Sequence, residues 1–169
     1  MNIIFLDIDG VLTQNSMSNI FNPKNVEALR TLLIKLPQMG LVITSNRRIR
    51  DMHLAQFRDL FHKNGIVQSR LIGTTPVLLK ETTSGLVSGI FGRGAEIQAF
   101  IEGQNYRSDC QERNNKPFTF NDFRIENFAI IDDQPEELQA FVDKLFLTQF
   151  PTGLTLEIVE KVIQYFNKD

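Results

Sequence analysis

Short apolar runs recur along the chain, and several of them stop at polar residues. Runs of this length and composition are typical of strands that are buried on both faces of a sheet. The first run is wholly apolar and ends at an acidic pair. We predict strands at residues 3–6, 41–44, 71–72, 128–131 and 146–148.

Between these runs, apolar residues recur at helical spacing. Asn22-Pro23 is typical of a capped helix start, and periodic apolar residues follow as far as Leu36. We expect further helices after Asp51, at residues 95–102, after Pro135 and at residues 158–166. Residues 73–92 and 103–124 are rich in polar and turn-forming residues, which favours loops in both places.

The alternation of strand and helix predicts the fold class. Such a chain forms a parallel sheet with helices on both faces. We therefore expect an α/β protein, a three-layer sandwich with a central parallel five-stranded Rossmann-like sheet. The length of 169 residues favours a single domain over residues 1–169.

Composition narrows the class of protein. Eighteen Lys and Arg against 20 Asp and Glu give a formal net charge of −2, which does not support a nucleic-acid partner. The single cysteine, Cys110, excludes an intrachain disulfide and fits a reducing compartment, so we predict a cytoplasmic protein. We expect no membrane partner and no secretory signal, whereas export by a route without a signal is left open.

The most informative segment is Asp7-Ile8-Asp9-Gly10, directly after the first strand. Residues two apart in an extended chain share a face, and glycine permits a sharp turn after the pair. Two close carboxylates repel each other unless a cation lies between them, and hard oxygen ligands suit Mg²⁺. The alternative is an ordinary acidic turn.

Polar residues also follow two later strands. Asp132-Asp133 forms a second acidic site, although one of these residues could simply cap a helix. Ser45 offers a hydroxyl that could hold phosphate oxygens, although serine is also common in turns. The carboxyl ends of parallel strands are where such folds bind ligands, so we expect these groups to lie close together.

A cation is expected near these acids. Arg93 stands just before a predicted helix and could neutralise a phosphate or an aspartate. Lys80 and Lys116 are rival candidates, and a solvated surface arginine is the alternative for Arg93.

With these residues the sequence resembles the haloacid dehalogenase (HAD) superfamily. The first motif corresponds to residues 7–11, the second to Thr44-Ser45-Asn46 and the fourth to Asp132-Asp133, with Arg93 as the third-motif cation. Residues 93–101 and 152–155 are similar to the small HAD-type domains also found attached to bacterial RNA-repair proteins. That group often has Trp-Arg after the second-motif serine, where this chain has Asn46-Arg47.

The resemblance implies a Mg²⁺-dependent phosphatase. Asp7 would be the nucleophile that forms an aspartyl-phosphate, and Asp9 the general acid and base, with a pKa raised by burial or acidic neighbours. Ser45 would hold a phosphate oxygen and Arg93 would supply positive charge. The metal ligands would be the Asp7 carboxylate, the Asp9 backbone carbonyl, Asp132, and Asp133 directly or through water.

Within that superfamily, Asp9 favours phosphate-ester hydrolysis over carbon–halogen cleavage, which needs no proton for the leaving group. Residues 10–40 and 73–92 are too short for a large cap domain, so we expect a capless or minimally capped site, with a small flap at residues 13–21. An open site would admit a phosphorylated substrate that is macromolecular, or would rely on a partner subunit to close it. Two alternatives are a catalytically weak domain that binds phosphate and metal, and a nucleic-acid end-processing phosphatase.

Overall fold

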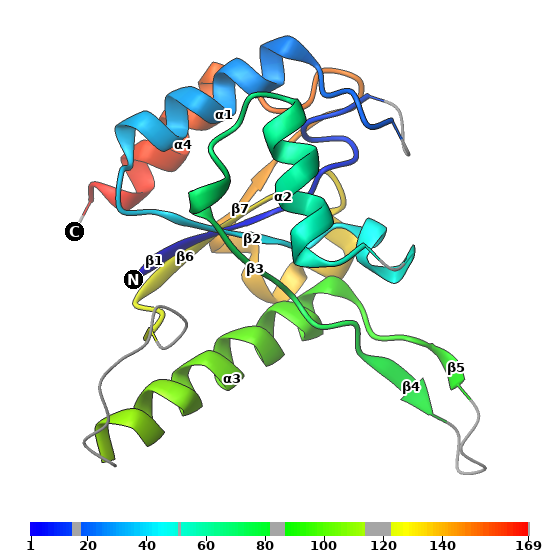
Figure 1. Ribbon diagram of the computed structural model, residues 1–169, viewed down its shortest axis with the longest axis vertical. Coiled ribbons are helices and arrows are strands. Elements are labelled where there is room, and N and C mark those ends of the chain that lie inside the picture. Colours follow the sequence, from blue (N-terminus) through cyan, green and yellow to red (C-terminus); the bar gives the residue numbers. More distant parts are fainter. Residues whose placement is uncertain (15–17, 51, 82–86, 114–122, 169) are drawn as a thin grey trace.

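The computed structural model describes residues 1–14, 18–50, 52–81, 87–113 and 123–168. A parallel sheet of five strands forms its centre, in the order β3-β2-β1-β6-β7 (Figure 1). These strands are β1 (Asn2–Leu6), β2 (Gly40–Ile43), β3 (Leu71–Thr74), β6 (Asn127–Asp132) and β7 (Leu145–Leu147). The five predicted strands and the α/β fold class are confirmed.

Strand β1 lies at the middle of this sheet and is buried on both faces. It pairs with β2 on one side and with β6 on the other. Ile4 and Leu6 pack into the apolar core on one face, whereas Ile3 and Phe5 pack into the core on the opposite face. Because successive side chains alternate between two buried faces, residues 3–6 of the strand are all apolar.

Helices cover both faces of the sheet (Figure 1). One face is covered by α1 (Pro23–Lys35), α2 (Leu54–Lys63) and α4 (Leu156–Phe166), and the other by α3 (Arg93–Arg113) and two 3₁₀ helices, η3 (Pro135–Glu137) and η4 (Gln139–Lys144). Two more 3₁₀ helices are η1 (Asn46–Arg50) and η2 (Gln68–Arg70). Within the described residues, no helix combines the length and the apolar character that a membrane span requires.

The loop expected at residues 73–92 is only partly correct. The segment contains the antiparallel pair β4 (Leu79–Glu81) and β5 (Val87–Ile90), which projects from the body of the molecule beside the start of α3 (Figure 1). These two strands are too short to give a clear alternating pattern. This pair lies in one of the two intervals where we considered a cap, whereas the small flap predicted at residues 13–21 is not tested, because residues 15–17 lie outside the described residues.

The prediction of a loop at residues 103–124 is wrong for its first half. Helix α3, expected only at residues 95–102, continues to Arg113. Residues 103–113 are mostly polar, and about half of them, a glycine included, have weak helix propensity, so this part lacks both the composition and the apolar periodicity by which a helix is recognised. Lys116 lies outside the described residues.

Two other helices differ in detail from the prediction. The segment after Pro135 forms η3 and η4 instead of an α-helix. A 3₁₀ helix rises about 2.0 Å per residue against about 1.5 Å for an α-helix, which lets a short connection between β6 and β7 cover more length. Helix α2 begins at Leu54, where the Gln56 side chain accepts a hydrogen bond from the His53 backbone N–H. Asp51, the expected cap, lies outside the described residues.

Candidate active site

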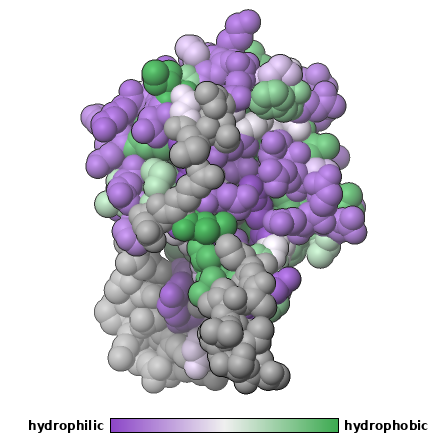
Figure 2. All heavy atoms as spheres, turned by 90° about the vertical axis from the view of Figure 1, so that its right-hand side faces the viewer, coloured by the Kyte–Doolittle hydropathy of each residue, from purple (hydrophilic) through white to green (hydrophobic). Residues whose placement is uncertain are grey.

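Polar side chains gather where strands β1, β2 and β6 end. Asp7 follows β1, Ser45 follows β2 by two residues, and Asp132 ends β6. These three strands are neighbours and run in the same direction, so their carboxyl ends meet at one edge of the sheet. Figure 2 shows this side of the molecule, and most of its coloured surface is hydrophilic.

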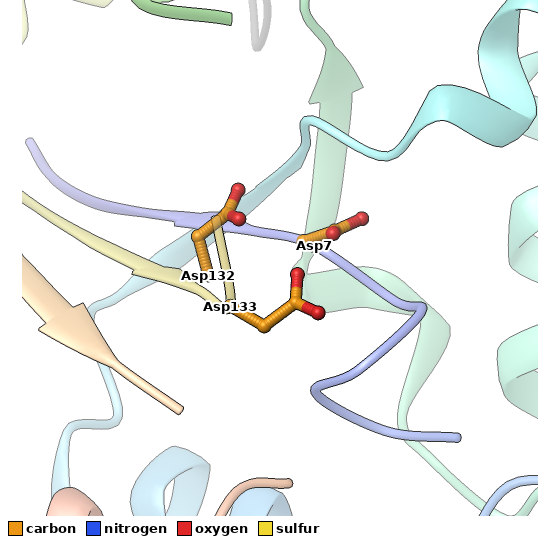
Figure 3. Close-up of side chains that lie close together, drawn as sticks. All are labelled: Asp7, Asp132 and Asp133. Atoms are coloured by element: carbon orange, nitrogen blue, oxygen red, sulfur yellow. The ribbon is translucent and has the colours of Figure 1, made fainter. Parts of the chain in front are cut away.

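Three carboxylates form a tight cluster at this edge. Asp7, Asp132 and Asp133 each offer an oxygen within 4.8 Å of the others (Figure 3). Asp7 and Asp132 are fully buried and Asp133 is half-buried. The Ser45 hydroxyl, also buried, hydrogen-bonds to Asp7. The fold therefore brings these four predicted site residues into one group.

Arg93 supplies the positive charge in this group. It stands at the first position of α3, and its side chain is only 3% exposed. Its Nη1 donates to Asp7 Oδ2 at 2.8 Å and also contacts Asp132 Oδ2. The backbone N–H of Arg93 donates to Glu137 Oε2 at 3.0 Å, which fixes the start of the helix against η3.

Burial and mutual repulsion raise the pKa values of the clustered acids. Desolvation raises the pKa of Asp7, and Arg93 only partly opposes it. Desolvation and the charge of Asp7 raise the pKa of Asp132 to about 7, and the same two causes raise the pKa of Asp133. Desolvation opposes the charge on Arg93, but Asp7 and Asp132 outweigh it and raise its pKa, so the guanidinium stays protonated.

The donor set fits a divalent cation. One guanidinium against three carboxylates leaves two negative charges in excess when all are ionised. The Oδ1 atom of Asp133 is buried and has no hydrogen-bond partner, and an unsatisfied buried carboxylate oxygen is costly. Carboxylate oxygens in this number are ligands that suit Mg²⁺, and a cation in the cluster would offset both costs.

Gly10 allows the chain to turn past this cluster. Its φ is +79°, in the left-handed region that favours glycine, and a Cβ there would lie 2.1 Å from Asp133 Oδ2. The residue after the acidic pair is thus restricted both by backbone conformation and by the space that Asp133 occupies.

We expect Gly10→Ala to destabilise the protein and to weaken Mg²⁺ binding. The backbone conformation alone costs about 1–2 kcal/mol for a residue with a Cβ, and Asp133 must also move. Thermal unfolding and a Mg²⁺ titration measure the two effects. Gly103→Ala is the matched control, because nothing lies within 4 Å of its Cβ, and we expect about 0.5–1 kcal/mol of stabilisation in this helix. Unchanged stability and Mg²⁺ affinity in Gly10→Ala would contradict this account.

Asp9 lies beside the cluster but outside it. Its carboxylate pairs with Arg47, whose Nη2 lies 2.6 Å from Asp9 Oδ1. The charge of Asp9 contributes in a small part to the raised pKa of Asp133. The resemblance assigns only the backbone carbonyl of Asp9 to the metal, and both this role and its role as an acid stay predictions.

The rival cations lie elsewhere or are not described. Lys80 is exposed on the hairpin, with its ammonium 5.3 Å from the centre of the Phe91 ring. Lys116 belongs to the residues that the structure does not describe. Arg93 is therefore the cation that contacts the carboxylates in the described part of the chain.

Sequence reasoning missed two arginines and a glutamate near the site. Arg47 contacts Asp9, and Arg48 forms a buried ion pair with Glu96, 2.6 Å between Nη2 and Oε2. The two arginines follow the predicted site residue Ser45 closely in the sequence, and this position could have indicated that they lie near the site. Their partners lie 38 and 48 residues away in the chain, so the local pattern did not reveal them.

The fold is a parallel sheet in which neighbouring strands end in acidic residues, with a serine and a cation beside them. This combination defines a HAD-type α/β domain. A family model described as the HAD domain in Swiss Army Knife RNA repair proteins matches residues 3–159. The chain belongs to this family, and with it to the HAD hydrolase superfamily. No curated protein matches the chain.

Proposed function

We propose that this protein is a phosphatase that hydrolyses a phosphate monoester through an aspartyl-phosphate on Asp7. The observation that supports the proposal most is the cluster of Asp7, Asp132 and Asp133 with Arg93 in contact. A nucleophilic carboxylate must approach an anionic phosphate, and this needs positive charge at the reacting atoms. The cluster offers a fixed guanidinium and ligands for a divalent ion.

In the first step, a carboxylate oxygen of Asp7 bonds to phosphorus while the bond between phosphorus and the leaving oxygen breaks. Asp9 gives its proton to that oxygen, so an alcohol leaves and the phosphoryl group stays on Asp7. In the second step, Asp9 takes a proton from water as the water oxygen attacks phosphorus. Phosphate then leaves, and the carboxylate of Asp7 is restored.

The other residues of the site orient the phosphoryl group. The Ser45 hydroxyl adjoins Asp7 and can donate to a phosphate oxygen there. Arg93 neutralises charge that spreads over the phosphate oxygens. Asp7, Asp132, Asp133 and the Asp9 carbonyl would hold Mg²⁺, which supplies electrostatic stabilisation of those oxygens when bound.

The decisive experiment measures phosphate release from 4-nitrophenyl phosphate with Mg²⁺ and with EDTA. We expect turnover that EDTA removes and added Mg²⁺ restores. Binding of Mg²⁺ and phosphate without turnover would instead favour the alternative, a domain that only binds phosphate and metal.

The substrate class is proposed from the lack of a large cap domain among the described residues. Between β3 and α3 these residues form only the short β4–β5 pair, so we infer a phosphate carried on a macromolecule. The family description refers to RNA repair proteins, and this makes the end of an oligonucleotide the first macromolecular substrate to test. Release of phosphate from 3′- or 5′-phosphorylated oligonucleotides well above that from phosphotyrosine or sugar phosphates would support it. Equal or lower rates would exclude the end-processing alternative.

We expect Mg²⁺ affinity to fall as the pH is lowered through about 7. Burial and the charge of Asp7 raise the pKa of Asp132 to about 7, so below this pH Asp132 carries a proton that the metal must displace. The affinity should drop about tenfold per pH unit where one proton is displaced for each ion bound. Calorimetric titration at pH 6, 7 and 8 measures it. An affinity that is constant over this range would contradict the assignment of Asp132 as a ligand.

A further inference from the structure

Arg47 holds both oxygens of the Asp9 carboxylate. It lies on η1, two residues after Ser45, and its Nε is 3.2 Å from Asp9 Oδ1 and 3.1 Å from Oδ2. Its Nη2 donates to Oδ1 at 2.6 Å and to the Ser18 carbonyl at 2.8 Å. The Arg47 side chain is 6% exposed, against 26% for Asp9. A buried, rigid guanidinium thus fixes a more accessible carboxyl group.

The same short helix also contacts Ser45. The backbone N–H of Arg47 donates to Ser45 Oγ at 3.4 Å, and Ser45 in turn hydrogen-bonds to Asp7. Arg47 therefore contacts Ser45 through its backbone and, through its side chain, Asp9, which follows Asp7 by two residues. Nε and Nη2 are both engaged with protein groups, which favours a supporting role over direct binding of a phosphate.

We propose that Arg47 is the positioning residue of Asp9, holding its carboxyl group where it passes a proton to the leaving oxygen. The inference rests on the proposed function. Asp9 lies beyond the end of β1, where its backbone forms an isolated bridge with Thr13, so the ladder of the central sheet does not extend to it. Two nitrogen donors in the fixed geometry of a guanidinium can hold a carboxyl group in a single orientation.

This role predicts an effect that depends on the leaving group. A nitrophenolate leaves without a proton, whereas an alkoxide needs one from Asp9 as the bond to phosphorus breaks. The value of kcat/KM reports the steps up to departure of the leaving group, before the shared aspartyl-phosphate is hydrolysed. Loss of Arg47 should therefore lower kcat/KM for an alkyl phosphate much more than for 4-nitrophenyl phosphate.

The test compares Arg47→Gln and Arg47→Lys on 4-nitrophenyl phosphate and glycerol 2-phosphate. A misplaced catalytic group costs about 10²-fold, and we expect a loss of this size for glycerol 2-phosphate in Arg47→Gln, with little change for 4-nitrophenyl phosphate. Arg47→Lys keeps the charge but not the paired geometry, so it should show the same selectivity. Adding Arg47→Gln to Asp9→Asn should cause no further loss, because the two act as a unit.

Arg58→Gln is the matched control. Its guanidinium donates to the Leu71 carbonyl at the opposite end of β3, and we expect kcat/KM to be unchanged on both substrates.

An equal loss on both substrates with a raised KM would overturn the proposal and make Arg47 a phosphate-binding residue. No loss on either substrate would overturn it too. If Arg47→Gln does not fold, as judged by circular dichroism, Arg47→Lys decides. Wild-type protein without turnover of either substrate would contradict the proposed function itself.

Discussion

Asp7→Asn should lower turnover of 4-nitrophenyl phosphate by about 10⁴-fold or more, the range seen when a nucleophile is removed. An amide has almost the same shape as a carboxylate but cannot attack phosphorus. The fully buried Asp7 contacts Arg93 and Ser45, so the substitution removes the reacting oxygen and leaves its surroundings in place. Phosphate release measures the loss of turnover, and labelling of the protein after acid quenching measures the loss of the aspartyl-phosphate. Retained turnover would show that Asp7 is not the nucleophile.

The same substitution should raise the stability of the metal-free protein at pH 8. Burial raises the pKa of Asp7 above its ordinary value of 3.8, so the folded state binds the proton more tightly than the unfolded state. Stability is therefore lost as the pH rises through the raised pKa, and Asn avoids this loss. The gain over wild type should vanish below pH 4. Asp59→Asn, on the exposed face of α2, is the control and should change neither turnover nor melting temperature.

Arg48→Met should destabilise the protein by about 3–5 kcal/mol, the usual cost of breaking a buried ion pair. Arg48 and Glu96 are each 3% exposed at the side chain, with 2.6 Å between Nη2 and Oε2. The guanidinium also donates to four backbone carbonyls, those of Thr44, Ser45, Thr75 and Pro76. These groups would lose their donor together. For a chain of this size, we expect the melting temperature to fall by about 6–20 °C.

Arg48→Met should also reduce turnover, because the pair joins segments that carry the site. Arg48 binds the end of β2 beside Ser45, and Glu96 lies on the first turn of α3, three residues after Arg93. Adding Glu96→Leu to Arg48→Met removes the uncompensated charge and should recover part of the stability. Lys161→Met breaks the exposed pair with Glu157 and should leave the melting temperature nearly unchanged. A small effect of Arg48→Met would show that the pair is dispensable.

The strands could be predicted from the sequence, but the connections could not be in full. A run such as residues 3–6 is wholly apolar because both of its faces are buried, and this pattern survives in any parallel sheet. The full length of helix α3 and the presence of the β4–β5 hairpin were not predicted, because each depends on backbone hydrogen bonding more than on a pattern of buried side chains. Local composition carries little information about such elements.

The acids of the site could be found for a related reason. Asp7 and Asp132 stand at strand ends, and the order of elements predicts a parallel sheet whose strand ends meet at one edge. That β1 and β6 are direct neighbours is a matter of strand order, which is set by how the whole chain packs. Arg93 was one of three candidate cations, and only its contact with both acids distinguished it.

The sequence alone determined which backbone segments are buried and which polar groups end them, because burial on two faces and strand direction leave local patterns. Only the tertiary structure decided the pairing of charges: Arg93 with Asp7 and Asp132, Arg47 with Asp9, and Arg48 with Glu96. The physical reason is that a long cationic side chain can reach any carboxylate within several ångströms. Its partner is chosen by where packing places the backbone and by which buried charges would otherwise stay uncompensated.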